Sequence, residues 1–251
     1  MENHHIVILA GGQGKRMNSD LPKVLHTVNS IPMIVHVIQT AIELKPERIW
    51  IIVGQYRQII SSTIEQYLTS EKLSMLTFVD QPVPRGTGDA IKQIIPVTES
   101  LPGSTPILIL SGDVPLIQSS MLKNLLDQCQ LASLLATDLD NPSGNGRLIC
   151  DEKGSIDRIV EEKDCDEEQK LITKVNCGTY VFKLSLLRHL LPLITNKNRS
   201  GEYYLTDLIE LISKHHGSVI NCVEVPRNLQ YTLHNVNTQS DLQFVSQSII
   251  E

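Results

Sequence analysis

The most informative stretch of this 251-residue chain is Ile6-Val7-Ile8-Leu9-Ala10-Gly11-Gly12-Gln13-Gly14-Lys15-Arg16-Met17. Its first four residues are apolar and mostly β-branched, which predicts a buried strand. The three glycines that follow let the backbone turn sharply and aim its N–H groups at an anion. Two cations, Lys15 and Arg16, come directly after the last glycine. The stretch therefore predicts a strand that leads into an anion-binding loop.

The glycine spacing excludes two common phosphate-binding loops. A Walker A loop has a glycine five residues before its second glycine and Ser or Thr after its lysine, but this chain has Leu9 and Arg16 there. A dinucleotide-binding loop needs a third glycine where Met17 stands. A tight turn without a ligand is the simplest alternative for a glycine cluster. The cations at 15, 16 and 23 favour a ligand site over that alternative.

Outward from this stretch, short apolar runs alternate with amphipathic segments. The pattern predicts strands at 6–9, 49–53, 73–79 and 107–110 and helices at 32–44, 56–68 and 90–95. Such alternation indicates βαβ crossovers and a mostly parallel sheet that helices cover on both faces. The fold class is therefore α/β.

The pattern changes after about residue 138. A hairpin is predicted from 147–150 to 156–160, followed by an exposed loop at 164–170, strands at 174–182 and 219–225, and helices at 203–213 and 240–250. No linker rich in Pro, Gly and Ser divides the chain. We expect a single domain, 1–251, with one lobe at about 1–138 and a smaller β-rich lobe with closing helices at about 139–251.

Composition excludes several classes of protein. Lys and Arg number 22 against 28 Asp and Glu, a net charge of −6, so no broad nucleic-acid surface is expected. No apolar run reaches the roughly 18 residues of a membrane span, and the N-terminus lacks the pattern of a signal peptide. The five cysteines form no C-x-x-C pair, which predicts free thiols in a reducing cytoplasm.

Seven further motifs follow the glycine loop and its continuation Asn18–His26. They are Gln81 with Gly86-Thr87-Gly88-Asp89-Ala90, Ser111–Leu116, Asn141–Arg147, Ile159–Asp164, Val175–Gly178, Gly201–Asp207 and Val236-Asn237. Each motif is weak alone, but the ordered set resembles the signature of the nucleoside-diphosphate-sugar pyrophosphorylase family. The resemblance is greatest to the uridylyltransferase domain of bacterial N-acetylglucosamine-1-phosphate uridylyltransferases, and it covers nearly the whole chain.

This resemblance implies a fold and a reaction. The fold is a Rossmann-like mixed, mostly parallel sheet flanked by helices, the nucleotide-diphospho-sugar transferase fold, with a nucleotide-binding lobe followed by a sugar-binding lobe. The reaction is Mg²⁺-dependent transfer of UMP from UTP to N-acetylglucosamine 1-phosphate, which yields UDP-N-acetylglucosamine and pyrophosphate. The acetyltransferase β-helix of those enzymes has no counterpart before Glu251, so neither acetyl transfer nor their trimer is expected, and the oligomeric state stays open.

The resemblance also implies catalytic and metal-binding residues. Both reactants are anionic, so catalysis needs alignment and charge neutralisation and no protein nucleophile. Arg16 is expected at the β- and γ-phosphates, and Lys23 at the α-phosphate. Asp113, just beyond a strand end, and Asn237 are the expected Mg²⁺ ligands. A helix-capping role is the alternative for Asn237.

The remaining site residues fall into two sets. Gln81 and the turn at Gly86 and Thr87 are expected to read the base, and the nucleotide site continues through Leu9, Ala10, Gly11, Gly12, Gly14 and Gly112. The expected sugar-binding residues are Gly146, Glu161, Asn176, Glu202, Tyr203 and Thr206. Without the resemblance, the segment around Glu161 would read as a solvated charged loop.

Three departures leave the specificity open. The resembling enzymes usually have His, Thr and Tyr where this chain has Asp89, Lys15 and Asn145. Glucose 1-phosphate with UTP or dTTP is therefore the alternative substrate pair, and a non-catalytic nucleotide-sugar-binding protein is the alternative class. A cytidylyltransferase acting on an alcohol phosphate lacks support from the motifs at 141–147 and 201–207. The presence of all four predicted catalytic and metal-binding side chains favours an enzyme.

Overall fold

The computed structural model describes residues 3–12, 14–217 and 219–248. Gln13 of the glycine loop, the side chain of Lys15 and the expected helix end at 249–250 lie outside that part of the chain. The strands are β1 (His5–Leu9), β2 (Thr27–Val28), β3 (Ile31–Pro32), β4 (Arg48–Val53), β5 (Leu76–Asp80), β6 (Pro106–Ser111), β7 (Ala132–Asp138), β8 (Arg147–Cys150), β9 (Ile156–Val160), β10 (Lys174–Lys183) and β11 (Ile220–Glu224).

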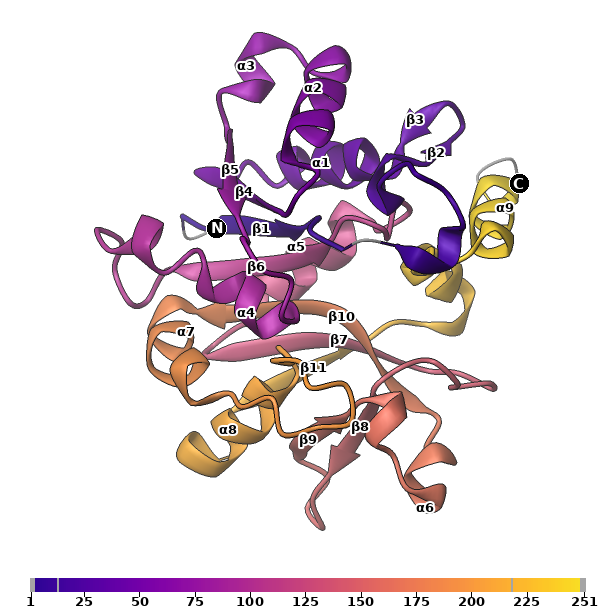
Figure 1. The fold of residues 1–251 in the computed structure, drawn as a ribbon. Coiled ribbons are helices and arrows are strands. Elements are labelled where there is room, and N and C mark those ends of the chain that lie inside the picture. The colour runs from indigo at the N-terminus through magenta and orange to yellow at the C-terminus, as the bar shows by residue number, and fades with distance from the viewer. Residues whose placement is uncertain (1–2, 13, 218, 249–251) are drawn as a thin grey trace.

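Most of these strands form one mixed sheet (Figure 1). Its order is β11-β7-β10-β6-β1-β4-β5, and the β8–β9 hairpin is attached through β10. The pairs β6–β1, β1–β4, β4–β5 and β11–β7 are parallel, whereas β10 is antiparallel to both of its long neighbours. The predicted mixed sheet is therefore confirmed. Strand β10 pairs with β7 along one edge, and along its other edge it pairs with β6 and, through Val175, with β8.

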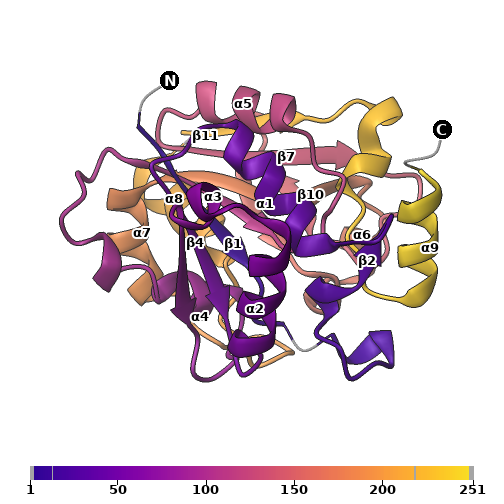
Figure 2. The same cartoon turned by 90° about the horizontal axis from the view of Figure 1, so that it is seen from above.

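Helices cover both faces of this sheet (Figures 1 and 2). The α-helices are α1 (Met33–Glu43), α2 (Arg57–Tyr67), α3 (Ser70–Leu73), α4 (Thr87–Lys92), α5 (Ser119–Asp127), α6 (Glu167–Lys170), α7 (Leu184–Leu190), α8 (Asp207–His216) and α9 (Gln239–Gln247). One apolar cluster joins the sheet to α1, α2 and α5, and a second joins it to α4, α7 and α8. Because β1 contributes Ile6 and Ile8 to the first cluster and Val7 to the second, it is buried on both faces, as its continuous apolar run predicts.

A third apolar cluster brings the end of the chain to its beginning. Met17 lies in the short 3-10 helix η1 (Lys15–Met17) and packs with Val28, Met33, Val236 and Val245. Both views show α9 beside the β2–β3 hairpin (Figures 1 and 2). This cluster therefore places the segment before α9 next to the glycine loop.

Several predicted element boundaries are wrong, and two of the errors arise because a capping side chain determines where a helix begins. The expected strand at 73–79 begins at Leu76, because Thr69 caps the short helix α3 instead. The expected loop at 164–170 contains α6, which Asp166 and Gln169 stabilise as a capping box. Helix α4 begins at Thr87 rather than at 90, and α8 begins at Asp207 rather than at 203. The sequence interpretation left α5, β7 and α7 unassigned.

The helices and the cysteines bear on two further predictions. No helix within the described ranges is long and apolar enough to cross a membrane. Each of the five cysteines, all of which the structure describes, carries a free thiol.

Candidate active site

The glycine loop leaves β1 at the carboxyl edge of the parallel strands. Leu9 pairs with Ser111, so β1 and β6 end side by side. The amide of Gly112 donates to the carbonyl of Leu9 at 2.9 Å, and a Cβ atom on Gly112 would lie 3.0 Å from that oxygen. This close approach places Asp113 directly beside the loop. Ligands of open α/β sheets gather at this edge.

Gly14 allows the segment at Lys23 to close over the loop. Its φ is +62°, and a Cβ atom there would lie 2.5 Å from the Cβ of Lys23. The loop and its surroundings line a cavity of about 790 Å³. Its lining includes the predicted residues Leu9, Ala10, Gly11, Gly12, Gly14, Lys23, Gln81, Gly86, Thr87, Asp113 and Glu202, together with Lys163 and Asn235.

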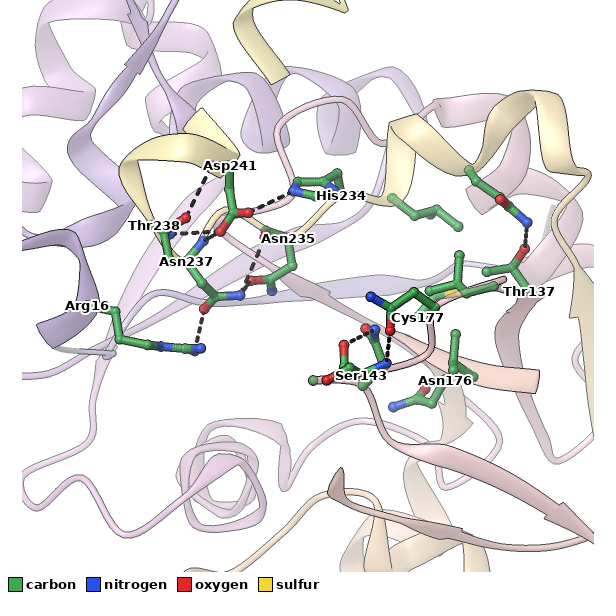
Figure 3. Close-up of a pocket in the computed structure, with 17 residues that line it drawn as sticks. Arg16, Thr137, Ser143, Asn176, Cys177, His234, Asn235, Asn237, Thr238 and Asp241 are labelled. Atoms are coloured by element: carbon green, nitrogen blue, oxygen red, sulfur yellow. Dashed lines mark hydrogen bonds and ion pairs between the residues drawn. The ribbon is translucent and has the colours of Figure 1, made fainter. Parts of the chain in front are cut away.

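Two cationic side chains and two side-chain oxygen atoms meet next to this cavity, in a cluster that we call the mouth of the site. The ammonium of Lys23, in the 3-10 helix η2 (Lys23–Leu25), forms an ion pair with the Oδ2 atom of Asp113 and donates to the Oδ1 atom of Asn237 at 3.0 Å. The guanidinium of Arg16 donates to the same Oδ1 atom at 2.9 Å (Figure 3). The Asn235 amide donates to the Oδ1 atom of Asp113 at 3.0 Å. Segments more than 200 residues apart therefore build one polar centre.

The loop before α9 holds Asn237 in this position. The Asp241 carboxylate accepts hydrogen bonds from the backbone amides of Asn237 and Thr238, at 2.9 and 2.8 Å (Figure 3). Burial acts to raise the pKa of Asp241, but these bonds and one from His234 lower it below its usual value. Because Thr238 is the N-cap of α9, the side chain of Asn237 is left to face Arg16 and Lys23.

The donor set of this centre suits Mg²⁺. Within the described ranges, no group of three or more His, Cys, Asp and Glu side chains could hold a metal ion. Mg²⁺, however, is usually bound by one or two protein oxygens while phosphates and water complete its shell. Asp113 Oδ2 and Asn237 Oδ1 already converge on one cation, the Lys23 ammonium. Their arrangement therefore fits a two-ligand magnesium site.

The predicted base-reading turn is fastened to the other end of the site by backbone contacts. Gly86 has φ +112°, and a Cβ atom there would lie 2.5 Å from the carbonyl oxygen of Tyr203. The amide of Gly88 donates to that carbonyl at 2.8 Å, and the amide of Leu205 donates to the Thr87 hydroxyl at 3.0 Å. Only glycine fits so close to a second backbone segment. The motifs at 86–90 and 201–207 thus form one unit.

The predicted sugar-binding residues do not all lie together. The Thr206 hydroxyl donates to the Glu161 carboxylate at 2.8 Å, and burial raises the pKa of Glu161. A Cβ atom on Gly146 would lie 2.9 Å from the Ile159 side chain and 3.6 Å from the carboxylate of Glu161. These residues form one polar group on the second lobe.

Asn176 lines a neighbouring cavity of about 520 Å³ (Figure 3). That cavity also contains Arg16, Asn145 and Asn237, and it shares Asn235 with the first cavity. The two cavities therefore flank the polar centre.

The comparisons with known proteins follow this geometry. A family model described as nucleotidyl transferase matches residues 5–225, which is most of the chain. The chain belongs to the nucleotidyl transferase family. The predicted resemblance to sugar-nucleotide pyrophosphorylases is confirmed by the named relatives below.

Two curated relatives illustrate the range of this nucleotidyl transferase family. A protein of Acanthamoeba polyphaga mimivirus named "Probable UDP-N-acetylglucosamine pyrophosphorylase" is 41% identical over 245 residues, which are 96% of this chain and 94% of that protein. The "Bifunctional protein GlmU" of Marinobacter nauticus is 39% identical over 95% of this chain but only 50% of its own length. The chain thus spans about half of the bifunctional relative.

Solved structures agree on the fold. A crystal structure of UDP-glucose pyrophosphorylase complexed with UDP-glucose superposes with a TM-score of 0.75 over 99% of this chain and 98% of that chain, at 16% identity. A putative glucose-1-phosphate thymidylyltransferase from Bacillus anthracis superposes with a TM-score of 0.72 at 20% identity. The nucleotide-diphospho-sugar transferase fold is therefore confirmed.

The sequence interpretation of this nucleotidyl transferase missed three polar residues of the site. Asn235 contacts Asp113, Asp241 holds the Asn237 loop, and Lys163 lines the larger cavity. The spacing of Thr238 and Asp241 resembles a capping box and could have revealed the second of these. Nothing in the local sequence marks Asn235.

The predicted sugar-binding residue Tyr203 lies apart from the others. Its ring lies near the guanidinium of Arg85, and Tyr203 lines a separate cavity of about 130 Å³.

Proposed function

We propose that this chain transfers UMP from UTP to N-acetylglucosamine 1-phosphate, with Mg²⁺, to form UDP-N-acetylglucosamine and pyrophosphate. One observation carries the proposal: Lys23 and Asp113, which line the glycine-loop cavity, converge with Arg16 and Asn237, which line the neighbouring cavity. The name of the mimivirus relative, whose length this chain nearly matches, supports the choice of sugar and base.

The chemistry needs two anions to approach each other. A phosphate oxygen of the sugar 1-phosphate forms a bond to the α-phosphorus of UTP, while the bond from that phosphorus to the bridging α–β oxygen breaks and pyrophosphate leaves. Lys23 offers its ammonium near the position assigned to the α-phosphate, and Arg16 offers its guanidinium to the departing pyrophosphate. Because both cations contact Asn237, the fold already brings them together beside the position proposed for the reacting phosphates.

A bound Mg²⁺ would be held by Asp113 and Asn237 and would neutralise phosphate charge and orient the phosphates. The Lys23 ammonium, which contacts Asp113 and Asn237 in this structure, would then contact phosphate instead. Asn235 donates a hydrogen bond to the Oδ1 atom of Asp113 and so fixes the orientation of that carboxylate. The Oδ2 atom of Asp113 is then left to face a cation, which is the Lys23 ammonium in this structure.

The sugar is placed over the second lobe. The Glu161 carboxylate, Gly146 and Thr206 form the polar group proposed to contact its hydroxyls, and Glu202 lines the cavity between them and the glycine loop. Asn176 is proposed to contact the acetamido group. Its side chain is held by a hydrogen bond to the Tyr180 hydroxyl at 2.6 Å, so its orientation is set in advance.

A substrate matrix tests this proposal. Pyrophosphate release is measured with Mg²⁺ for UTP, dTTP, CTP and GTP against the 1-phosphates of N-acetylglucosamine, glucose and N-acetylgalactosamine. We expect the highest kcat/KM for UTP with N-acetylglucosamine 1-phosphate. A preference for another pair would contradict the assigned specificity while retaining the reaction class. A folded chain that releases no pyrophosphate across the matrix would favour a nucleotide-sugar-binding protein.

A further inference from the structure

The departure at Asp89 creates a contact that the base-reading residue depends on. Asp89 lies in α4 and is 5% exposed. Its Oδ2 atom accepts a hydrogen bond from the Nε2 atom of Gln81 at 2.9 Å, and its Oδ1 atom accepts one from Arg85 at 2.9 Å. Both carboxylate oxygens are therefore satisfied, which lets a charged group remain buried beside the nucleotide cavity.

These contacts determine which way the Gln81 amide points. The Nε2 atom of Gln81 donates to the Gly86 carbonyl at 3.0 Å as well as to Asp89. A carboxylate and a carbonyl only accept hydrogen bonds, so the NH₂ group is the half of the amide that must face them. The carbonyl half, Oε1, then lies toward the glycine loop: a Cβ atom on Gly11 would be 3.3 Å from it. Gly11 and Gln81 both line the nucleotide cavity.

We infer that Asp89 is a specificity-determining positioning residue, which makes Gln81 present a hydrogen-bond acceptor to the base. Uracil carries an N–H donor at N3, whereas cytosine carries an unprotonated nitrogen there. An acceptor held toward N3 therefore matches UTP and repels CTP. This inference rests on the proposed function, since it concerns the nucleotide of the same reaction.

The environment of Asp89 keeps this orientation rigid. The guanidinium of Arg85 lies 5.9 Å from the centre of the Tyr203 ring, and the Tyr203 amide donates to the Arg85 carbonyl at 2.8 Å. The cation that neutralises Asp89 is thus tied to the same segment that braces the Gly86 turn. The Asp89 carboxylate, like the Gly86 carbonyl, accepts hydrogen bonds and donates none. The Gln81 amide can therefore satisfy both of them in only one orientation.

The Asp89→Asn variant tests the inference. An asparagine amide can offer either its oxygen or its NH₂ to Gln81, so only the Gly86 carbonyl still requires the NH₂ half of Gln81. The rotated amide, which presents NH₂ to the base, then loses one hydrogen bond instead of two. We expect the ratio of kcat/KM for UTP to that for CTP to fall about tenfold or more, because the acceptor is no longer enforced. Equilibrium binding of UTP and CTP, measured by calorimetry without sugar phosphate, should show the same loss of preference. If Asp89 had only a structural role, its substitution would lower kcat/KM for UTP and for CTP by the same factor and leave their ratio unchanged.

Asp80→Asn is the matched control. Asp80 is also an aspartate paired with an arginine, Arg57, at 2.6 Å, but it lies on the exposed end of β5. Its substitution should leave the UTP-to-CTP ratio at the wild-type value. Asp89→Ser removes the carboxylate without adding bulk and replaces the Asn variant if that variant melts below the assay temperature.

The outcomes separate the inference from the proposed function. A wild-type preference for UTP that persists in both Asp89 variants overturns the inference and leaves the proposed function intact. A wild-type chain that turns over no UTP contradicts the proposed function. In that case the binding ratio for UTP and CTP, compared between wild type and the Asp89 variants, still decides the role of Asp89.

Discussion

The predicted base-reading end and the mouth of the candidate active site are built in different ways. At the base-reading end, Gly86 and Gly88 bring two backbone segments together, and hydrogen bonds between main-chain groups join them. At the mouth, the side chains of Arg16 and Lys23 meet Asn237 from 221 and 214 residues away. The predicted base-reading end therefore depends on glycines, which have no side chain and let two backbone segments approach closely. The mouth depends instead on charged side chains that the fold brings together.

The largest expected effect comes from the mouth. Asp113→Asn removes the carboxylate charge opposite Lys23 and the anionic ligand proposed for Mg²⁺. We expect kcat to fall by at least about 100-fold, because the cation proposed to neutralise the reacting phosphates loses its anionic protein ligand. The Mg²⁺ concentration that gives half-maximal activity should rise. Turnover and thermal melting are measured together, and unchanged Mg²⁺ dependence in a folded variant would remove Asp113 from the site.

A backbone substitution tests the base-reading end. Gly86→Ala places a Cβ atom 2.5 Å from the Tyr203 carbonyl and should cost roughly 3 kcal/mol of stability through strain and steric overlap. Gly154→Ala is the control, because Gly154 also has positive φ, at +80°, but nothing lies within 4 Å of its added Cβ. Its cost should be about 1 kcal/mol from backbone strain alone. Equal losses in urea unfolding would show that the contact with Tyr203 contributes nothing.

A smaller effect is expected at the sugar end. Glu161→Gln keeps the size of the side chain but replaces the partly buried carboxylate that accepts a hydrogen bond from the Thr206 hydroxyl. We expect the KM for the sugar 1-phosphate to rise about tenfold, since a charged hydrogen bond becomes a neutral one. The KM for UTP should stay near its wild-type value. An equal rise in both KM values would place Glu161 outside the sugar subsite.

The smallest effect concerns pH. Burial, followed by the charges of Glu210, Glu161 and Asp164, raises the pKa of Asp207 from 3.8 to about 6. The folded chain therefore binds this proton more tightly than the unfolded chain, so the associated stability is present below about pH 4 and is lost as the pH rises to about 6. The change is at most about 3 kcal/mol, and partial exposure to solvent reduces it.

Asp207→Asn removes this titration. Melting temperatures measured between pH 4 and pH 7 should fall less steeply with rising pH in the variant than in the wild type. Parallel curves would contradict a raised pKa at Asp207. Asp80→Asn, which alters an exposed carboxylate, serves as the reference for this comparison.

Local sequence was a good guide where one physical rule dominates. The continuous apolar runs of β1, β4 and β6 predicted buried parallel strands within one or two residues of their ends. Boundaries failed where capping side chains decide them, as at Thr69 before α3 and at Asp166 before α6. Strand β7 was missed even though six of its seven residues are buried.

The amino-acid sequence was sufficient to predict the α/β class, the glycine loop after β1 and, through its ordered motifs, the family. These properties depend on residues close together in the chain, where apolar periodicity and glycine geometry act directly. Only the tertiary structure decided that Asn235 orients Asp113, that Asp241 holds the Asn237 loop and that Asp89 turns the Gln81 amide. Each of these contacts is a hydrogen bond whose direction depends on which groups the packed segments leave facing each other.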